Sequence, residues 1–194
     1  SGLVIVLTPI LERFGLSSVS VTTYQSLSGR GDALYDRSLV VNNVYPLHGS
    51  EERTEEYIRA EVKKVLGIPV PISVACYRVD TQEGHLVDLR IKTARPIGSR
   101  GDVLRAFAEF SPLHALGLRS APTFPIVVLD EIGRPRPQQD AWHGNGMAVA
   151  VGNIAIDDEV DDLRLTYVVN NLVRGAAGGA LLNAELWQHR RVTR

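Results

Sequence analysis

Short runs of hydrophobic residues recur along the chain and are separated by longer amphipathic stretches. Residues 19–24 are β-branched and alternate with polar positions, which predicts a strand. Further strands are predicted at residues 39–44, 72–79, 86–93, 124–129, 147–156 and 163–169. A glycine lies in the connection at residues 83–84, so we expect residues 72–79 and 86–93 to form an antiparallel pair with a longer loop.

The remaining patterned segments predict helices. Residues 3–14 are mostly apolar and are followed by Gly15, while residues 50–66 carry one apolar stripe and are followed by Gly67. Residues 101–110 and 170–188 complete the set. Strands and helices alternate irregularly, which predicts an α+β fold around a mixed, largely antiparallel sheet.

Composition narrows the function. The chain has 194 residues, is 44% hydrophobic and carries a formal net charge of −1, so nothing in it favours nucleic acid or an anionic membrane as a partner. One cysteine excludes an internal disulfide or a multi-cysteine zinc site, and the scattered histidines suggest no metal site. The sequence also lacks a strand, glycine-rich turn and helix of the dinucleotide-binding kind.

The segment that begins at Cys76 holds the first candidate chemistry. Arg78 and His85 lie seven residues apart, and a permanent cation beside an imidazole suits a carboxylate substrate on which a proton moves. A solvated strand and turn is the simpler alternative. Cys76 lies among apolar residues in the middle of a predicted strand, so we expect a structural cysteine rather than a nucleophile.

Two segments rich in small residues could approach a ligand. Gln25 ends a predicted strand and leads into Ser28-Gly29-Arg30-Gly31, where backbone N–H groups could meet a phosphate. Residues 174–179 place three glycines near the start of the last helix, which a ligand near the helix N-terminus would explain. An ordinary turn and tight helix packing are the respective alternatives.

Four ordered motifs together resemble the C-terminal domain of the aspartate-β-semialdehyde dehydrogenase family, most closely its archaeal and fungal branch. They cover nearly the whole chain and lie at residues 21–31, 76–85, 134–152 and 171–186. The resemblance implies a sheet with helices on one face. It also implies a substrate-binding and dimerisation domain over residues 1–169, and a helix over residues 170–194 that packs on an absent dinucleotide-binding domain.

The family's chemistry, as the resemblance implies it, is NADP-dependent reduction of an acyl phosphate to an aldehyde through a thioacyl-cysteine. By position, His85 would be the acid and base, Gln25 would orient the intermediate, and Arg78 would bind the substrate carboxylate. Further substrate-binding positions would be Glu56 and Arg59, and cofactor-binding positions would be Ser28, Gly29, Asn171 and Gly175. A cytoplasmic homodimer or higher oligomer is expected.

The chain departs from the family pattern in ways that keep alternatives open. The family's nucleophilic cysteine precedes the first helix, so the isolated chain is expected to be inactive. The family's Glu-x-x-Lys motif is altered in this chain, with Arg53, Tyr57 or Arg59 at the lysine position. Asp80 adds a carboxylate that could compete with the substrate for Arg78. A related acyl-CoA reductase and a non-catalytic oligomerisation module therefore remain alternatives.

Overall fold

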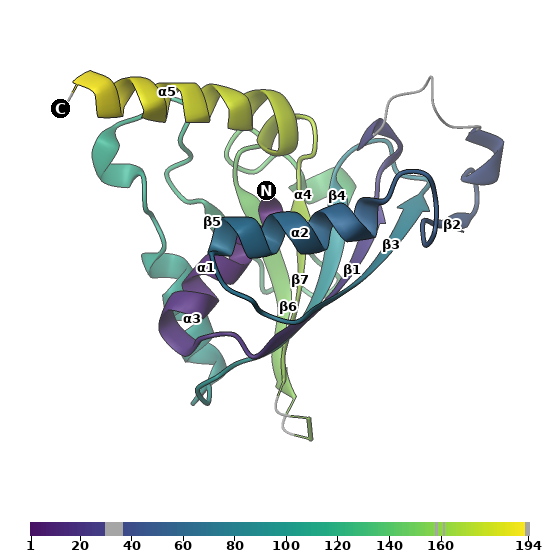
Figure 1. The fold of residues 1–194 in the computed structure, drawn as a ribbon, viewed down its shortest axis with the longest axis horizontal. Coiled ribbons are helices and arrows are strands. Elements are labelled where there is room, and N and C mark those ends of the chain that lie inside the picture. The colour runs from purple at the N-terminus through teal and green to yellow at the C-terminus, as the bar shows by residue number, and fades with distance from the viewer. Residues whose placement is uncertain (30–36, 158, 161, 193–194) are drawn as a thin grey trace.

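The computed structural model describes residues 1–29, 37–157, 159–160 and 162–192. In this part of the chain seven strands form one sheet in the order β2-β3-β1-β4-β7-β6-β5 (Figure 1). The β1–β3 and β5–β6 pairings are parallel and the other four are antiparallel. The strands are β1 (Ser18–Gln25), β2 (Val44–Pro46), β3 (Ile72–Val79), β4 (His85–Lys92), β5 (Ile126–Val128), β6 (Val149–Asp157) and β7 (Asp162–Val169). The predicted mixed, largely antiparallel sheet is confirmed.

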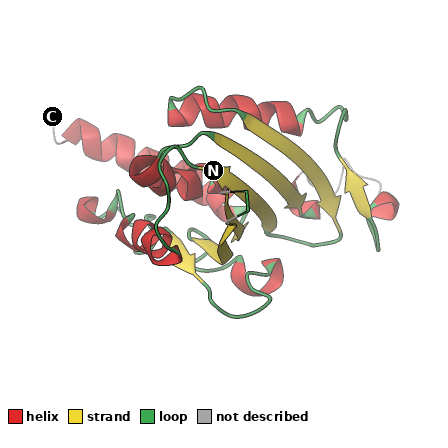
Figure 2. Cartoon of the chain, turned by 90° about the horizontal axis from the view of Figure 1, so that it is seen from below, coloured by secondary structure: helices red, strands yellow, loops and turns green. Residues whose placement is uncertain are grey.

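Helices cover one face of this sheet. The long ones are α1 (Gly2–Phe14), α2 (Thr54–Leu66), α3 (Arg100–Glu109) and α5 (Gly178–Val192), and α4 (Pro137–Asp140) is a single turn. Figure 2 shows α2 lying across the strands, and the core joins apolar residues of α1, α2 and α3 to one face of the sheet. Val6, Leu7 and Ile10 of α1 are fully buried at helical spacing, which explains the strong apolar pattern of this segment. Every helix in the described residues is too short or too polar to cross a membrane.

The predicted hairpin of β3 and β4 is wrong. β1 lies between them, parallel to β3 and antiparallel to β4. Val19, Val21 and Thr23 of β1 are buried, as befits a strand with neighbours on both sides. The connection from β3 to β4 crosses the end of β1, where Thr81 and Gln82 accept backbone hydrogen bonds from Leu27 and Ser28 at 2.8 and 3.1 Å.

Several predicted boundaries also move. The extended run at residues 39–44 is replaced by a 3-10 turn (Arg37–Leu39), and β2 begins only at Val44. The helix predicted from residue 50 begins at Thr54. The last helix splits into a π-helical turn (Val173–Ala177) and α5. Asn170, which follows β7, caps the start of this segment, since its Oδ1 accepts the N–H groups of Leu172 and Val173 at 3.0 and 2.9 Å.

Candidate functional site

The alternation of the strands brings three predicted site residues to one end of the sheet. Gln25 and Arg78 are the last core-facing positions of β1 and β3, and they are Cα partners in the register. His85 is the first residue of β4, on the same face as buried Val87. Since β4 is antiparallel to β1, its first residue lies at the end where β1 and β3 finish. These positions would extend the core, but here they hold polar side chains.

Arg78 is an arginine within the protein interior, only 1% exposed. Its Nη1 donates to the Ser26 carbonyl at 2.9 Å, and its Nη2 donates to Glu52 Oε2, also at 2.9 Å. Desolvation lowers the pKa of this guanidinium. A buried cation with an adjacent carboxylate is therefore fixed at the end of β3.

His85 is half-buried beside the loop that follows β1. Its Nδ1 accepts the Ser26 N–H at 3.2 Å and lies 3.1 Å from Ser26 Oγ. Burial, and then the positive charges of Arg78 and of the Ser1 amino group, lower the pKa of His85 to about 4. The ring is therefore neutral near pH 7, with its proton on Nε2, because the backbone N–H can only donate.

Asn171 joins this group from the segment after β7. Its Oδ1 accepts the Gly84 N–H at 2.9 Å, and its Nδ2 donates to Ser28 Oγ at 3.0 Å. Gln25 is buried, and its Nε2 donates to Thr23 Oγ1 at 3.1 Å. The structure thus brings Gln25, Arg78, His85, Ser28 and Asn171 together, although their roles stay predictions.

Gly29 closes the site from the outside, in a 3-10 turn (Leu27–Gly29). A Cβ at this position would lie 2.8 Å from Arg78 Nη1 and 3.0 Å from His85 Cε1. Real Cβ atoms do not approach so closely, so only glycine fits between the guanidinium and the imidazole. This close approach supports the prediction that Gly29 belongs to the site.

Glu56 and Arg59 are not drawn into this cluster by any contact of the described residues. The Glu56 carboxylate pairs with Arg53 on the exposed surface of α2. Arg59 Nη2 lies 3.6 Å from Glu55 Oε2, and Glu55 Oε1 accepts the Cys76 N–H at 3.1 Å. Both residues therefore remain predictions without geometric support.

Glu52 is the acidic residue that reaches Arg78, and the sequence reasoning missed it. It lies in the turn before α2, where the helical pattern that singled out Glu56 does not apply. The expectation that Asp80 would compete for Arg78 finds no support, because Asp80 Oδ2 accepts the Asn42 N–H at 3.2 Å on the surface. The contact of Glu52 with Arg78 depends on the conformation of the turn before α2. It therefore leaves no periodic pattern in the sequence from which it could be predicted.

Gly175 lies in the π-helical turn, exposed, with its nearest potential Cβ contact at 3.8 Å. The following Ala176 and Ala177 are also exposed. The apolar side chains of α5 are partly exposed, because Leu181 is 55% exposed while Leu182 is 4% exposed. The start of α5 thus presents a surface of small residues.

Cys76 is buried in the core, and desolvation raises the pKa of its thiol, as expected for a structural cysteine. Among the described residues, no group of three or more histidine, cysteine or acidic side chains could hold a metal ion.

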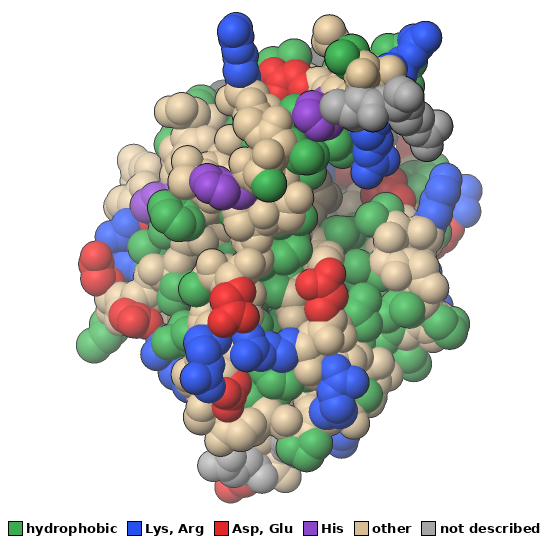
Figure 3. All heavy atoms as spheres, turned by 90° about the vertical axis from the view of Figure 1, so that its left-hand side faces the viewer, with side chains coloured by type: hydrophobic (Ala, Val, Ile, Leu, Met, Phe, Trp, Pro, Cys, Tyr) green, Lys and Arg blue, Asp and Glu red, His purple; other side chains and the backbone are tan. Residues whose placement is uncertain are grey.

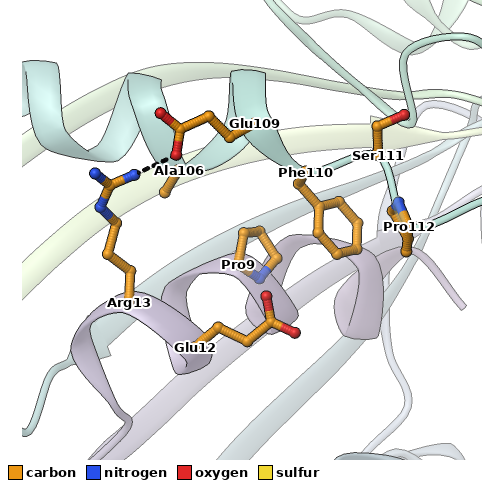
Figure 4. Close-up of a pocket in the computed structure, with 8 residues that line it drawn as sticks. All are labelled: Pro9, Glu12, Arg13, Ala106, Glu109, Phe110, Ser111 and Pro112. Carbon is orange, nitrogen blue, oxygen red and sulfur yellow. Dashed lines mark hydrogen bonds and ion pairs between the residues drawn. The ribbon is translucent and has the colours of Figure 1, made fainter. Parts of the chain in front are cut away.

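A pocket in the described residues lies elsewhere. It is an open groove of about 450 Å³ between α1 and α3, and the Arg13–Glu109 ion pair spans one end of it (Figure 4). None of the predicted site residues lines it. On the face shown in Figure 3, acidic and basic side chains are interspersed rather than gathered by sign.

Comparison with known proteins agrees with this fold. The family described as "Semialdehyde dehydrogenase, dimerisation domain" matches residues 7–174. The aspartate-semialdehyde dehydrogenase of Trichophyton rubrum is 35% identical over 200 residues, covering 95% of this chain and 54% of the relative. That of Methanothermobacter thermautotrophicus is 36% identical over 196 residues, covering 95% of this chain and 55% of the relative.

Solved structures show the same fold. Aspartate semialdehyde dehydrogenase from Candida albicans, crystallised with NADP, superposes with a TM-score of 0.85 at 30% identity and covers 98% of this chain and 56% of its own. Aspartate semialdehyde dehydrogenase II from Vibrio cholerae has a TM-score of 0.78 at 21% identity, covers 96% of this chain and 59% of its own, and shares the fold. The chain spans about half the length of these relatives. It is a member of the semialdehyde dehydrogenase dimerisation-domain family.

Proposed function

We propose that this chain is the substrate-binding and dimerisation part of an NADP-dependent semialdehyde dehydrogenase. The reaction would be the reductive dephosphorylation of aspartyl phosphate to aspartate semialdehyde, through a thioacyl-cysteine, in the cytoplasm. The observation that carries the proposal is the convergence of Gln25, Arg78 and His85 at one end of the sheet.

The geometry supports a separate role for each of these side chains. The buried Arg78 guanidinium can bind a substrate carboxylate through two parallel hydrogen bonds. The Gln25 amide, held by Thr23, can orient the acyl group, and His85 presents Nε2 toward the reacting atoms. Glu52 balances the charge of Arg78 and, beside a bound carboxylate, would favour a substrate that also carries a cationic group.

The start of α1 supports the proposed position of the nucleophile. A Cβ on Gly2 would lie 3.0 Å from side-chain atoms of Tyr167 and Val169 at the end of β7, and Val169 is the register partner of His85 on β4. A cysteine shortly before α1 in a longer protein would therefore enter beside His85, where a helix N-terminus lowers the pKa of a thiol. We expect the chain without that cysteine to be inactive.

The residues present also fit the proposed cofactor. Ser28, Gly29 and Asn171 border His85, and exposed Gly175 leaves the start of α5 uncovered for a flat ring. NADP bound there would supply or accept the hydride. The chain's own part would be to place the acyl carbon and keep His85 beside its oxygen.

Oligomerisation follows from surfaces that the helices leave uncovered. Ser20 of β1, Ser73 of β3 and Arg90 of β4 are exposed on the face opposite the core, which we propose as the homodimer contact. Leu181 and Trp187 of α5, 55% and 61% exposed, would pack on a dinucleotide-binding domain. A monodisperse monomer in light scattering would contradict the dimer.

The activity test compares a full-length parent protein with its Arg78→Leu and His85→Ala variants. NADP- and phosphate-dependent oxidation of aspartate semialdehyde is expected for the parent and a large loss for both variants. An exposed Arg136→Leu variant serves as the matched control and should retain activity. No turnover by a folded, dimeric parent would refute the proposal.

An acyl-CoA reductase of the same fold is the second candidate, favoured by the arginines of the α2 region. Arg53 pairs with Glu56, and Arg59 lies beside Glu55, so neither has a contact that directs it toward Arg78. Acyl phosphates and acyl-CoA esters offered to the same parent separate the two reactions. If the parent turns over neither acyl phosphates nor acyl-CoA esters, the remaining alternative is a non-catalytic oligomerisation module.

A further inference from the structure

Ser26 touches both of the ionisable groups at the site, although no role was assigned to it. The residue is fully buried at the end of β1. Its carbonyl accepts from Arg78 Nη1 at 2.9 Å, and its N–H donates to His85 Nδ1 at 3.2 Å. Its hydroxyl lies 3.1 Å from the same Nδ1. Ser26 therefore supplies the hydrogen-bond partners of His85 Nδ1.

A chain of polar groups leads to Ser26 from the far side of the site. Asn171 Nδ2, which can only donate, bonds to Ser28 Oγ at 3.0 Å. Ser28 Oγ lies 3.2 Å from Ser26 Oγ. The Gly84 N–H, donating to Asn171 Oδ1 at 2.9 Å, fixes which end of the amide faces Ser28.

These contacts set the direction of the hydrogen bonds. Because the Asn171 amide donates to Ser28, the Ser28 hydroxyl is free to donate to Ser26, and the Ser26 hydroxyl to donate to His85. Ser26 Oγ also lies 3.2 Å from Asn171 Oδ1, an alternative acceptor that already receives the Gly84 N–H. Successive bonds that point the same way polarise one another, which favours the direction toward His85.

We propose that this one-way chain, Asn171 to Ser28 to Ser26, together with the Ser26 N–H, fixes the proton of neutral His85 on Nε2. Nδ1 then accepts from two donors, the N–H and the hydroxyl of Ser26. In the other tautomer the Nδ1–H would point at the Ser26 N–H, so two donor groups would repel each other. The positive charge of the Arg78 guanidinium, on β3, opposes a second ring proton. Ser26, Ser28 and Asn171 are thus positioning residues.

The inference deepens the proposed function and rests on it for its catalytic meaning. With Nε2 already protonated, neutral His85 donates a hydrogen bond to the acyl oxygen as negative charge develops there. The same Nε2 can give up its proton as an acid and take one up afterwards as a base, which is consistent with the role that the resemblance implies. His85 would act as a hydrogen-bond donor in the manner of a neutral catalytic imidazole.

The test is imidazole ¹⁵N NMR of this chain at pH 7, without substrate or cofactor. We expect His85 to show a protonated Nε2 and an unprotonated, hydrogen-bonded Nδ1. In Ser26→Ala the Nδ1 resonance should move toward that of an unbonded nitrogen, and in Ser28→Ala it should move less in the same direction. Ser17→Ala, at an exposed position directly before the same strand, is the matched control and should leave the His85 Nδ1 resonance unchanged.

A proton on Nδ1 of the wild-type ring would overturn the proposal, as would a Ser26→Ala spectrum that matches that of Ser17→Ala. If Ser26→Ala does not fold, the wild-type tautomer and Ser28→Ala decide the question. The measurement needs no turnover. An inactive parent enzyme would refute the proposed function but would not change the tautomer measured for His85. A proton on Nδ1 would refute the tautomer proposal but would not change the activity measured for the parent.

Discussion

Gly29 offers the most direct test of the site geometry. In Gly29→Ala the new methyl group would lie 2.8 Å from Arg78 Nη1, 3.0 Å from His85 Cε1 and 3.2 Å from His85 Nε2. Arg78 cannot easily retreat, because it is 1% exposed and is held by Ser26 and Glu52 at 2.9 Å each. The methyl must therefore displace the guanidinium or the imidazole. Overpacking of this kind costs about 1–3 kcal/mol, comparable with the loss of one hydrogen bond to a charged group.

Urea unfolding followed by circular dichroism measures this loss, and the His85 ring resonances report whether the ring has moved. Gly101→Ala is the matched control. Gly101 is exposed in the first turn of α3, where the nearest contact of a Cβ is 3.4 Å, so that change should be neutral or stabilise by less than about 1 kcal/mol. A Gly29→Ala protein with wild-type stability and unmoved His85 resonances would refute the packing of Gly29 against both side chains.

Three further predictions concern charge. Arg78→Met should lower the free energy of unfolding by about 3–5 kcal/mol, since it leaves Glu52, 10% exposed, without its cation, and adding Glu52→Leu should recover much of the loss. Arg174→Met should instead stabilise this chain by about 1–3 kcal/mol, because Nε and Nη1 of Arg174 are buried without a hydrogen-bond partner among the described residues; an unchanged urea midpoint would contradict this. Burial places the folded-state pKa of His85 at about 4, below its ordinary 6.5, so the unfolded chain binds the proton more readily between these values. Stability should therefore fall by about 2 kcal/mol as the pH drops from 6.5 to 4, and His85→Gln should lose this part of the pH dependence.

The sequence predicts the elements well where one periodicity dominates. Residues 72–79 form β3 with the predicted bounds, residues 86–93 alternate cleanly and form β4 one residue earlier, and the mostly apolar residues 3–14 form α1. The hydrophobic periodicity predicts an element less well where local hydrogen bonds change the backbone geometry. The helix predicted over residues 170–188 begins as a π-helical turn (Val173–Ala177) and becomes α5 only at Gly178, while Asn170 caps its start by accepting the N–H groups of Leu172 and Val173.

The order of the strands in the sheet is the main feature of the fold that could not be predicted from the sequence. Adjacent strands joined by a loop with glycine favour a hairpin, but here β1 pairs with β3 on one side and with β4 on the other. The glycine in that loop serves a different purpose. Gly84 has a φ of 83°, a conformation that glycine tolerates, and its N–H reaches Asn171 after the chain has crossed the end of β1.

The insertion of β1 also changes the meaning of the seven-residue spacing between Arg78 and His85. In a hairpin the two side chains would face each other across neighbouring strands and could pair without help. Here they lie on strands separated by β1, and both contact the residue that follows its end. The Ser26 carbonyl binds Arg78 and the Ser26 N–H binds His85, so one peptide segment fixes the cation and the imidazole relative to each other. A change that shifts the end of β1 must therefore disturb both groups together, whereas changes in the β3–β4 connection act on His85 first.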